Sequence, residues 1–115
     1  MLDGRQTLTR KRDIKHCAWI RTLPCVICGD NTTVECCHIR MADPELDKPL
    51  TGMGIKPDDV WTLPMCGKHH REQHRNGEYM FWEGVGLVPT IMALMLYTVS
   101  GDNEKAEQII KEWQQ

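Results

Sequence analysis

The sequence predicts a small α+β fold in which residues 1–115 form a single domain. Segments rich in β-branched residues alternate with helical segments, and prolines and glycines separate them. Hydrophobic residues make up 41% of the chain and aromatic residues only 6%, with a single phenylalanine, which favours a loop-rich fold. A domain of this length has a core too small to be robust by itself, so a further source of stability is expected.

The first half contains one helix and one strand. Residues 11–22 are predicted to be helical and to end before Pro24, because the residue before a proline disfavours the helical conformation. The turn-forming residues 29–31 then lead into residues 32–39, which are rich in β-branched side chains and predict a strand.

A long loop and a second strand come next. Residues 41–57 hold three prolines and two glycines and predict a loop, of a length that is usually functional or disordered. Residues 60–63 predict a strand that Pro64 stops. A helix over residues 68–75 is predicted to end at Asn76-Gly77, a favourable helix C-terminus.

Two helices are predicted in the C-terminal region, residues 87–115. One spans residues 89–99 and the other residues 103–113, with the break at Ser100-Gly101-Asp102. The stretch from residue 87 to 99 is strongly apolar but too short to cross a membrane, so it predicts a core helix. The N-terminal residues are followed by charged residues and not by the apolar stretch of a signal sequence. The six cysteines are therefore expected to be reduced in a cytosolic compartment.

Four residues have the spacing of a closed metal site. Cys25 and Cys28 lie three apart before Gly29, which can adopt the positive φ that such turns use, and Cys66 and His69 repeat the spacing downstream. Three cysteines and one histidine are a usual set for structural zinc. A redox Cys-x-x-Cys pair and ordinary buried cysteines are the alternatives, and the downstream Cys-x-x-His favours zinc. Such a site contributes on the order of 10–16 kcal/mol, against a typical domain stability of about 5–15 kcal/mol, so zinc is expected to decide folding.

His70 and His74 predict a second metal centre. On a helix, residues four apart present their side chains on one face, with Cβ atoms about 5–6 Å from each other. Adjacent helical residues point roughly 100° apart, so His69 and His70 need not share one ion.

The charge distribution predicts a nucleic-acid-binding arm over residues 1–12. The chain has a net charge of −2, but residues 1–21 carry six basic and two acidic side chains, so this region is +4 and the rest −6. Such a segment can follow a phosphate backbone by counterion release, although a solvated helix face is the alternative. The candidate DNA-binding residues here are Arg10, Lys11, Arg12 and Lys15.

The predicted elements follow in the order of a ββα-metal finger: a strand, a long loop, a second strand and a helix that carries histidines. The chain resembles the HNH-type nucleases (His-Me finger), and most closely the phage and prophage branch of Ref-like recombination-enhancement nucleases. Several motifs between about residues 15 and 82 carry the resemblance: Pro24-Cys25-Val26-Ile27-Cys28-Gly29, Cys36-Cys37-His38-Ile39-Arg40, Lys56-Pro57-Asp58-Asp59, Leu63-Pro64-Met65-Cys66-Gly67-Lys68-His69-His70-Arg71-Glu72-Gln73-His74, and Gly77 with Phe81-Trp82.

The resemblance implies a metal-dependent endonuclease that hydrolyses DNA. It places His38 as the general base and Cys37 as a ligand of the catalytic metal, with His70 and His74 as the remaining ligands. The family often has Asn at the position that orients the base. Here Asp59 is the nearest candidate and Asp58 the second.

The residue types fit this chemistry. A neutral histidine can accept a proton from water near pH 7, and a carboxylate at Asp59 would fix its tautomer. Arg40, Lys68 and Arg71 could clamp phosphates by charge-assisted hydrogen bonds. The expected products are 5′-phosphate and 3′-hydroxyl ends, with one metal acting as Lewis acid.

The identity of the expected catalytic metal depends on how soft its ligands are. A cysteine and two histidines favour Zn²⁺, and the resemblance also allows Mg²⁺ or Mn²⁺. Mg²⁺ prefers oxygen ligands and would leave Cys37 as an ordinary buried residue. The resemblance also implies DNA and a recombinase as partners and the bacterial host cytoplasm as location. The alternatives are a non-catalytic zinc-finger module that binds nucleic acid, and a structural protein that dimerises through residues 89–99.

Overall fold

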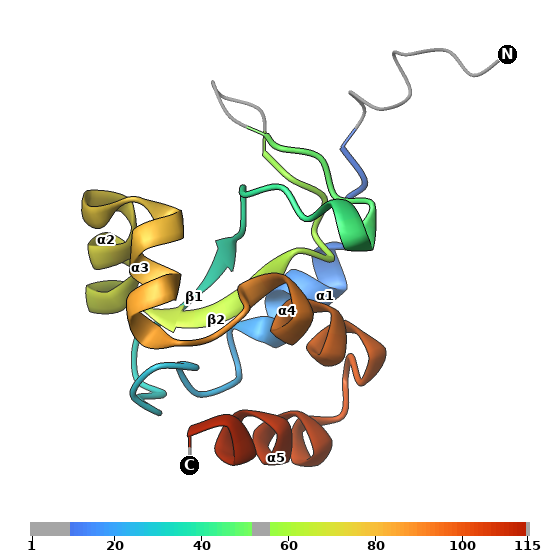
Figure 1. The fold of residues 1–115 in the computed structure, drawn as a ribbon. Helices are drawn as coiled ribbons and strands as arrows, with labels where there is room; N and C mark the ends of the chain where they lie inside the picture. Colours follow the sequence, from blue (N-terminus) through green and yellow to red (C-terminus); the bar gives the residue numbers. More distant parts are fainter. Residues whose placement is uncertain (1–9, 52–55, 115) are drawn as a thin grey trace, which may run out of the picture.

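The computed structural model describes residues 10–51 and 56–114. In this part of the chain the fold is α+β, with a two-stranded sheet and five α-helices (Figure 1), so the predicted class is confirmed. Of the predicted basic arm, residues 1–9 lie outside the described residues. The elements are α1 (Ile14–Ile20), β1 (Val34–His38), the 3₁₀ helix η2 (Pro44–Leu46), β2 (Thr62–Cys66), α2 (Gly67–Asn76), α3 (Glu78–Val85), α4 (Pro89–Thr98) and α5 (Asn103–Gln114).

The two strands form an antiparallel hairpin in which Val34 lies opposite Cys66 and His38 opposite Thr62. The prediction that Pro64 stops the second strand is wrong, because β2 continues through it to Cys66. Both strands of a two-stranded sheet are edge strands, where a proline is tolerated if its nitrogen faces away from the partner strand. The carbonyl of Pro64 also faces outward and accepts a hydrogen bond from the N–H of Val26 at 3.0 Å.

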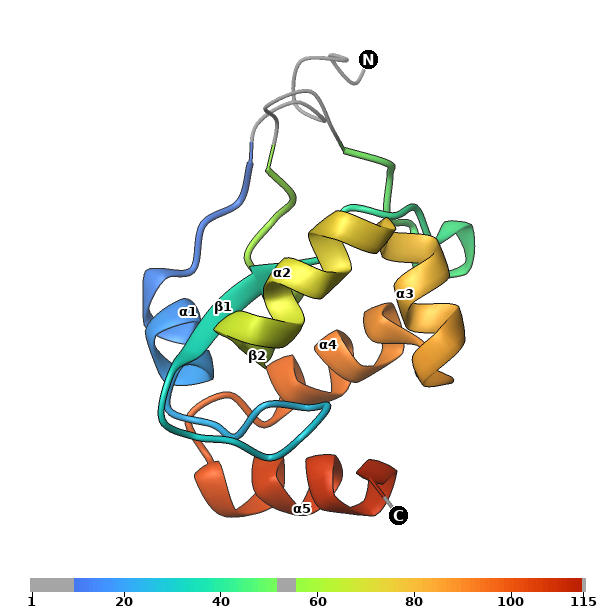
Figure 2. The ribbon, with the colours of Figure 1, turned by 90° about the vertical axis from the view of Figure 1, so that its left-hand side faces the viewer.

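Helix α2 covers one face of the hairpin and α1 lies on the other (Figures 1 and 2). Successive residues of a strand point to opposite faces. Accordingly, Cys37 contacts Gln73 of α2, whereas His38 contacts Asp59 on the α1 side. Helix α1 is shorter than predicted and begins after Asp13, whose side chain accepts a hydrogen bond from the N–H of His16.

The predicted helices over residues 68–75, 89–99 and 103–113 correspond to α2, α4 and α5. Helix α3 was not predicted from the sequence. This helix follows α2 at Gly77, which has φ +87°, and it ends at the left-handed Gly86. Helix α5 lies apart from the hairpin, and the Gln114 amide at its end donates to the carbonyls of Cys25 and Val26.

One hydrophobic core joins the hairpin to the helices. Its fully buried members include Ile20, Leu23, Val26, Cys37, Ile39, Leu63, Met65, Trp82, Leu96 and Ile110. No single helix among the described residues is long and apolar enough to cross a membrane. Taken together, α3 and α4 are long and apolar enough by length and composition alone, but the two helices are bent by 79° at their junction.

Candidate functional site

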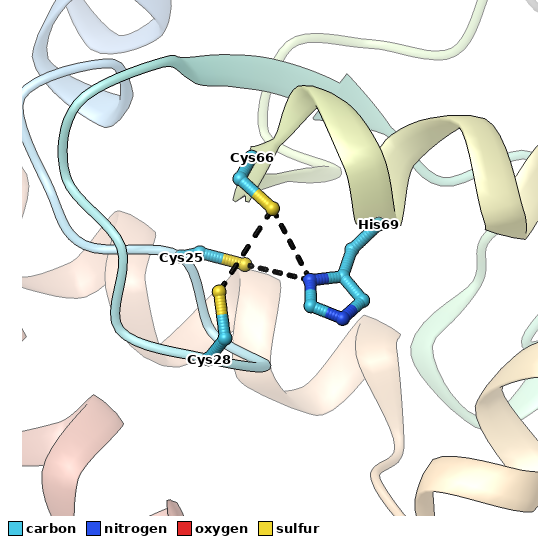
Figure 3. A group of neighbouring side chains, drawn as sticks. All are labelled: Cys25, Cys28, Cys66 and His69. Carbon is cyan, nitrogen blue, oxygen red and sulfur yellow. Dashed lines mark hydrogen bonds between the residues drawn. The ribbon is translucent and has the colours of Figure 1, made fainter.

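Four side chains converge beside the N-terminus of α2 (Figure 3). Cys25 and Cys28 come from the turn after α1, and Cys66 and His69 from the end of β2 and the first turn of α2. Cys66 Sγ lies 3.2 Å and Cys25 Sγ 3.9 Å from His69 Nδ1, and Cys28 Sγ lies 3.9 Å from Cys66 Sγ. A tetrahedral ion with bonds of about 2.0–2.3 Å holds its ligand atoms roughly 3.3–3.8 Å apart. This group, which we call the Cys₃His site, could therefore hold a metal ion, as predicted.

The turn that carries Cys25 and Cys28 is built for this arrangement. Gly29 has φ +78°, and its N–H donates to the carbonyl of Cys25 at 2.9 Å, which closes the turn. The N–H of Ile27 points at Cys25 Sγ at 3.4 Å, a contact that stabilises a thiolate. Partial desolvation and the neighbouring Cys25 raise the pKa of Cys28 to about 11. A bound cation would remove this obstacle to ionisation, because it offsets the repulsion between neighbouring thiolates.

A second group lies on the α1 side of the hairpin. His38 ends β1, and its Nε2 lies 2.9 Å from Oδ1 of Asp59, in the turn before β2. The Asp59 side chain is 0% exposed, whereas that of His38 is 17% exposed. Asp58 instead accepts a hydrogen bond from the N–H of Lys11 at 2.8 Å, so of the two candidates Asp59 is the carboxylate that contacts His38.

Asp59 accepts hydrogen bonds at both of its oxygens. Arg10 Nη2 donates to Oδ1 at 2.7 Å, and the N–H of Asp13 donates to Oδ2 at 2.7 Å. Burial raises the pKa of Asp59, but the hydrogen bonds from His38, Asp13 and Arg10 outweigh burial and hold the pKa well below its usual range. Asp59 is thus a carboxylate at neutral pH.

The charge of Asp59 defines the tautomer of His38. A carboxylate only accepts hydrogen bonds, so Nε2 of His38 carries the hydrogen and Nδ1 carries the lone pair. Arg10 Nη2 lies 3.1 Å from Nε2, but both atoms are then donors that share the Asp59 oxygen. Burial lowers the pKa of His38, although Asp59 opposes the shift, and a neutral imidazole is favoured at pH 7. The pair has the geometry of a base and its orienting group.

Cys17 lies close enough to His38 and Asp59 for the three to be considered as metal ligands. Two features argue against that use. The guanidinium of Arg10 already neutralises Asp59, and it would repel a second cation at the same oxygen. Desolvation, together with the neighbouring Cys36, raises the pKa of the Cys17 thiol to about 12. We therefore describe this group as a hydrogen-bonded pair beside a neutral thiol.

The predicted ligands of a catalytic metal do not form a site in the described part of the chain. Cys37 is fully buried in the core, where its Sγ faces Gln73 Oε1 at 3.6 Å. Burial raises its pKa far above that of a free thiol. His70 and His74 do share one helix face, with ring centroids 4.9 Å apart, but His70 Nδ1 is bonded to Glu35 Oε1 at 2.7 Å. None of the three belongs to a group of metal-binding side chains among the described residues.

The predicted phosphate-binding residues fall into separate groups. Lys11, Arg12 and Lys15 are exposed, and the backbone of Lys11 and the side chain of Arg12, which is 59% exposed, lie against Asp59. Arg10, by contrast, is committed to Asp59 and to the carbonyl of Pro57.

The other basic candidates lie on the α2 side. Lys68 and Arg71 border a hollow of about 530 Å³ beside the Cys₃His site. Arg40 lies with His74 around another hollow, and its N–H donates to Glu78 Oε2 at 2.8 Å.

Sequence reasoning missed three contributors to these groups: Arg10 as a donor to Asp59, Asp13 through its N–H, and Gln73 beside Cys37. The partners of Arg10 and Asp13 are 46 to 49 residues away. No local pattern pairs such distant segments. The capping position of Asp13 before a helix was the one available signal.

A family model described as a protein of unknown function, DUF968, matches residues 5–96. The chain belongs to the DUF968 family. The DUF968 match includes the Cys₃His site and the His38–Asp59 pair and ends within α4.

A relative of the DUF968 protein is the uncharacterized protein YdfU of Escherichia coli K12. The two are 36% identical over 62 residues, which are 52% of this chain, and the chain spans 15% of the length of that relative. No solved structure matches the chain.

Proposed function

We propose that this DUF968 protein is an endonuclease that hydrolyses DNA phosphodiester bonds, with His38 as general base and Asp59 as its orienting residue. The observation that carries the proposal is the His38–Asp59 pair: a fully buried carboxylate 2.9 Å from Nε2 of a partly exposed histidine. Nδ1 has no hydrogen-bond partner among the described residues, so its lone pair can accept a proton from water.

In the proposed reaction, His38 Nδ1 takes a proton from a water molecule as the water oxygen attacks phosphorus. The bond between phosphorus and the 3′ oxygen breaks, leaving a 5′-phosphate, and the 3′ oxygen takes a proton from solvent. Asp59 stabilises the imidazolium that forms, and general base catalysis of this kind contributes about 10²- to 10⁴-fold. The exposed Lys11, Arg12 and Lys15 provide positive charge for neighbouring phosphates.

Zn²⁺ is the ion we propose for the Cys₃His site. Three thiolates and one imidazole in a closed tetrahedral set are typical of structural zinc and leave no open position for substrate. The role of this zinc is to stabilise the fold, since it ties the turn after α1 to the start of α2.

The resemblance to HNH nucleases also implies a catalytic Zn²⁺, Mg²⁺ or Mn²⁺. The donor set expected for it, Cys37 with His70 and His74, does not fit, because the thiol is buried against Gln73 and His70 is bonded to Glu35. No step of the proposed reaction therefore depends on this ion.

The order of β1, β2 and α2, with His38 ending the first strand, supports a ββα-metal assignment of the hairpin and helix. On this assignment we propose DNA as the substrate, a recombinase as partner and the bacterial cytoplasm as location. The basic residues near His38 support an anionic substrate.

A zinc-stabilised module that binds nucleic acid without cutting it is the second candidate. The observation in its favour is that the predicted ligands of a catalytic metal do not meet. In such a protein the His38–Asp59 pair would serve only to hold the turn before β2.

The two functions are separated by the nicking of supercoiled plasmid DNA by zinc-loaded protein, with Mg²⁺, Mn²⁺ or Zn²⁺ added in turn. The nuclease proposal expects nicking that His38→Ala reduces at least 100-fold while DNA binding is retained. His74→Ala, at an exposed histidine of α2, is the matched control and should cut normally. Equal cutting by wild type and His38→Ala would remove His38 as the base. Binding without cutting by the wild type would favour the second candidate.

A further inference from the structure

Residues 10–13, which we call the N-terminal strap, are fastened to residues 57–59. Arg10 Nε donates to the carbonyl of Pro57 at 3.1 Å, and the N–H of Asp59 donates to the carbonyl of Lys11 at 3.0 Å. These contacts add to the two hydrogen bonds that the strap gives to the carboxylate of Asp59. The strap is therefore part of the wall of the candidate site.

We propose that Arg10 is a positioning residue, which holds the carboxylate of Asp59 beside His38 and keeps Nδ1 of His38 free of a proton. This inference rests on the proposed function of His38 as base. A buried carboxylate is costly unless a positive charge and hydrogen bonds compensate it. The N–H of Asp13 and a neutral His38 supply hydrogen bonds without charge. Arg10 is the one cationic hydrogen-bond donor to Asp59 among the described residues.

Without that cation, the His38–Asp59 pair would take up a proton more readily, because the charge of Arg10 opposes a second proton on His38. The imidazole is more basic than the carboxylate of Asp59, so the added proton would lie on Nδ1 of His38, while Nε2 would still donate to Asp59. Nδ1 is the atom that must accept a proton from water. Loss of Arg10 is thus expected to disable the base without disturbing the surface that meets DNA.

The competing interpretation is that Arg10 binds a DNA phosphate, as its place in a basic segment predicts. The geometry disfavours it, because Nε and Nη2 are both bonded to the protein. Arg12 offers a matched comparison in the same strap. Its Nε lies 3.8 Å from Asp59 Oδ2, beyond hydrogen-bonding distance, and its side chain is exposed.

The test compares Arg10→Met, Arg12→Met and Arg10→Lys in the full-length, zinc-loaded protein. Side-chain ¹⁵N chemical shifts of His38 report directly which of its two nitrogens carry a proton, and plasmid nicking gives kcat and KM. Arg10→Met should raise the fraction of His38 that carries a proton at Nδ1 at pH 7 and lower kcat about 10- to 100-fold with little change in KM. Arg12→Met should keep the protonation of His38 and kcat but raise KM and reduce the salt slope of DNA binding by about 1. Arg10→Lys should fall between wild type and Arg10→Met, since lysine keeps the charge but cannot reproduce the fork of donors.

Unchanged protonation of His38 at Nδ1 in Arg10→Met would overturn the inference. A second result would also overturn it: both Arg10→Met and Arg12→Met raise KM and reduce the salt dependence of DNA binding, while kcat is unchanged. Arg10 would then be a phosphate contact. If Arg10→Met does not fold, the protonation of His38 at Nδ1 in Arg10→Lys decides. The NMR readout needs no catalysis, so a wild type that cuts no DNA would refute the proposed function and still leave the role of Arg10 to be decided.

Discussion

Cys37 and His38 are neighbours in β1, but their side chains project to opposite faces of the hairpin. The thiol of Cys37 faces Gln73 of α2, whereas the imidazole of His38 faces Asp59 on the side of α1. A metal ligand and a base taken from these two positions would therefore act on different sides of the sheet. This relationship separates the candidate base from the ligand set that the sequence predicted.

Cys37→Ala is expected to leave metal content and DNA cleavage unchanged. It should lower the free energy of unfolding by about 1 kcal/mol, because a buried sulfur atom is lost from the core. Metal analysis and urea unfolding check the two parts. Loss of a metal equivalent would contradict the structure by making Cys37 a ligand.

Cys25→Ala is expected to abolish cooperative folding, because it opens the Cys₃His site. Structural zinc supplies on the order of 10–16 kcal/mol, which matches or exceeds the typical stability of a small domain. Thermal unfolding followed by circular dichroism provides the measurement. Cys36→Ala removes a thiol outside the site and serves as control, since it should keep one zinc per chain. A folded Cys25→Ala protein would rule out an essential metal.

Gln73→Leu is expected to destabilise the junction of α2 and α3. Gln73 is 2% exposed, and its Oε1 accepts a hydrogen bond from Trp82 Nε1 at 2.8 Å. Removing the acceptor leaves a buried N–H without a partner, at a cost of about 1–3 kcal/mol. Chemical unfolding of Gln73→Leu and of Gln108→Leu, at an exposed position, gives the comparison. Equal stabilities for the two variants would show that the hydrogen bond contributes nothing measurable.

Stability is expected to fall as the pH drops below about 6.5, the ordinary pKa of histidine. Desolvation lowers the pKa of His16, whose Nδ1 contacts Ser100 Oγ at 2.7 Å and whose buried Nε2 has no partner in the described residues. The pKa of His38 is lowered as well. Between the folded pKa and 6.5 the unfolded chain binds more protons than the folded chain, so acidification favours unfolding.

The experiment for His16 is thermal unfolding from pH 7.5 to 5.5 for wild type and His16→Gln. The variant lacks the titrating group, so its melting temperature should fall less steeply. Both proteins keep His69, so a loss of metal affects them equally and the difference isolates His16. Parallel curves would exclude His16 as a source of the pH dependence.

The sequence predicted local features well. The spacing of Cys25, Cys28, Cys66 and His69 identified a group that the fold brings together, because each pair is set by a turn or the start of a helix. Helix α4 followed from its apolar sequence, and the ends of α2, α4 and α5 followed from glycine, proline and asparagine residues at their boundaries. Helix α3 was missed, since α2 and α3 are separated by Gly77 alone.

Long-range relationships were less accessible. The strand periodicity that sends Cys37 and His38 to opposite faces is visible in the sequence, but the resemblance to HNH nucleases placed both in one site. Arg10 was read as part of a DNA-binding arm because nothing local indicates its contact with Asp59, 49 residues away. Pro64 was read as the end of a strand, because the sequence did not show that β2 lies at a sheet edge.

Chemical rescue of His38→Gly tests the role of His38 most directly. Single-turnover nicking of plasmid DNA is measured for wild type and His38→Gly, with and without added imidazole, at constant zinc content. The account predicts at least a 100-fold loss in His38→Gly that imidazole partly restores, more so at pH 8 than at pH 6 because only the neutral form accepts a proton. Cleavage by His38→Gly at the wild-type rate would contradict it.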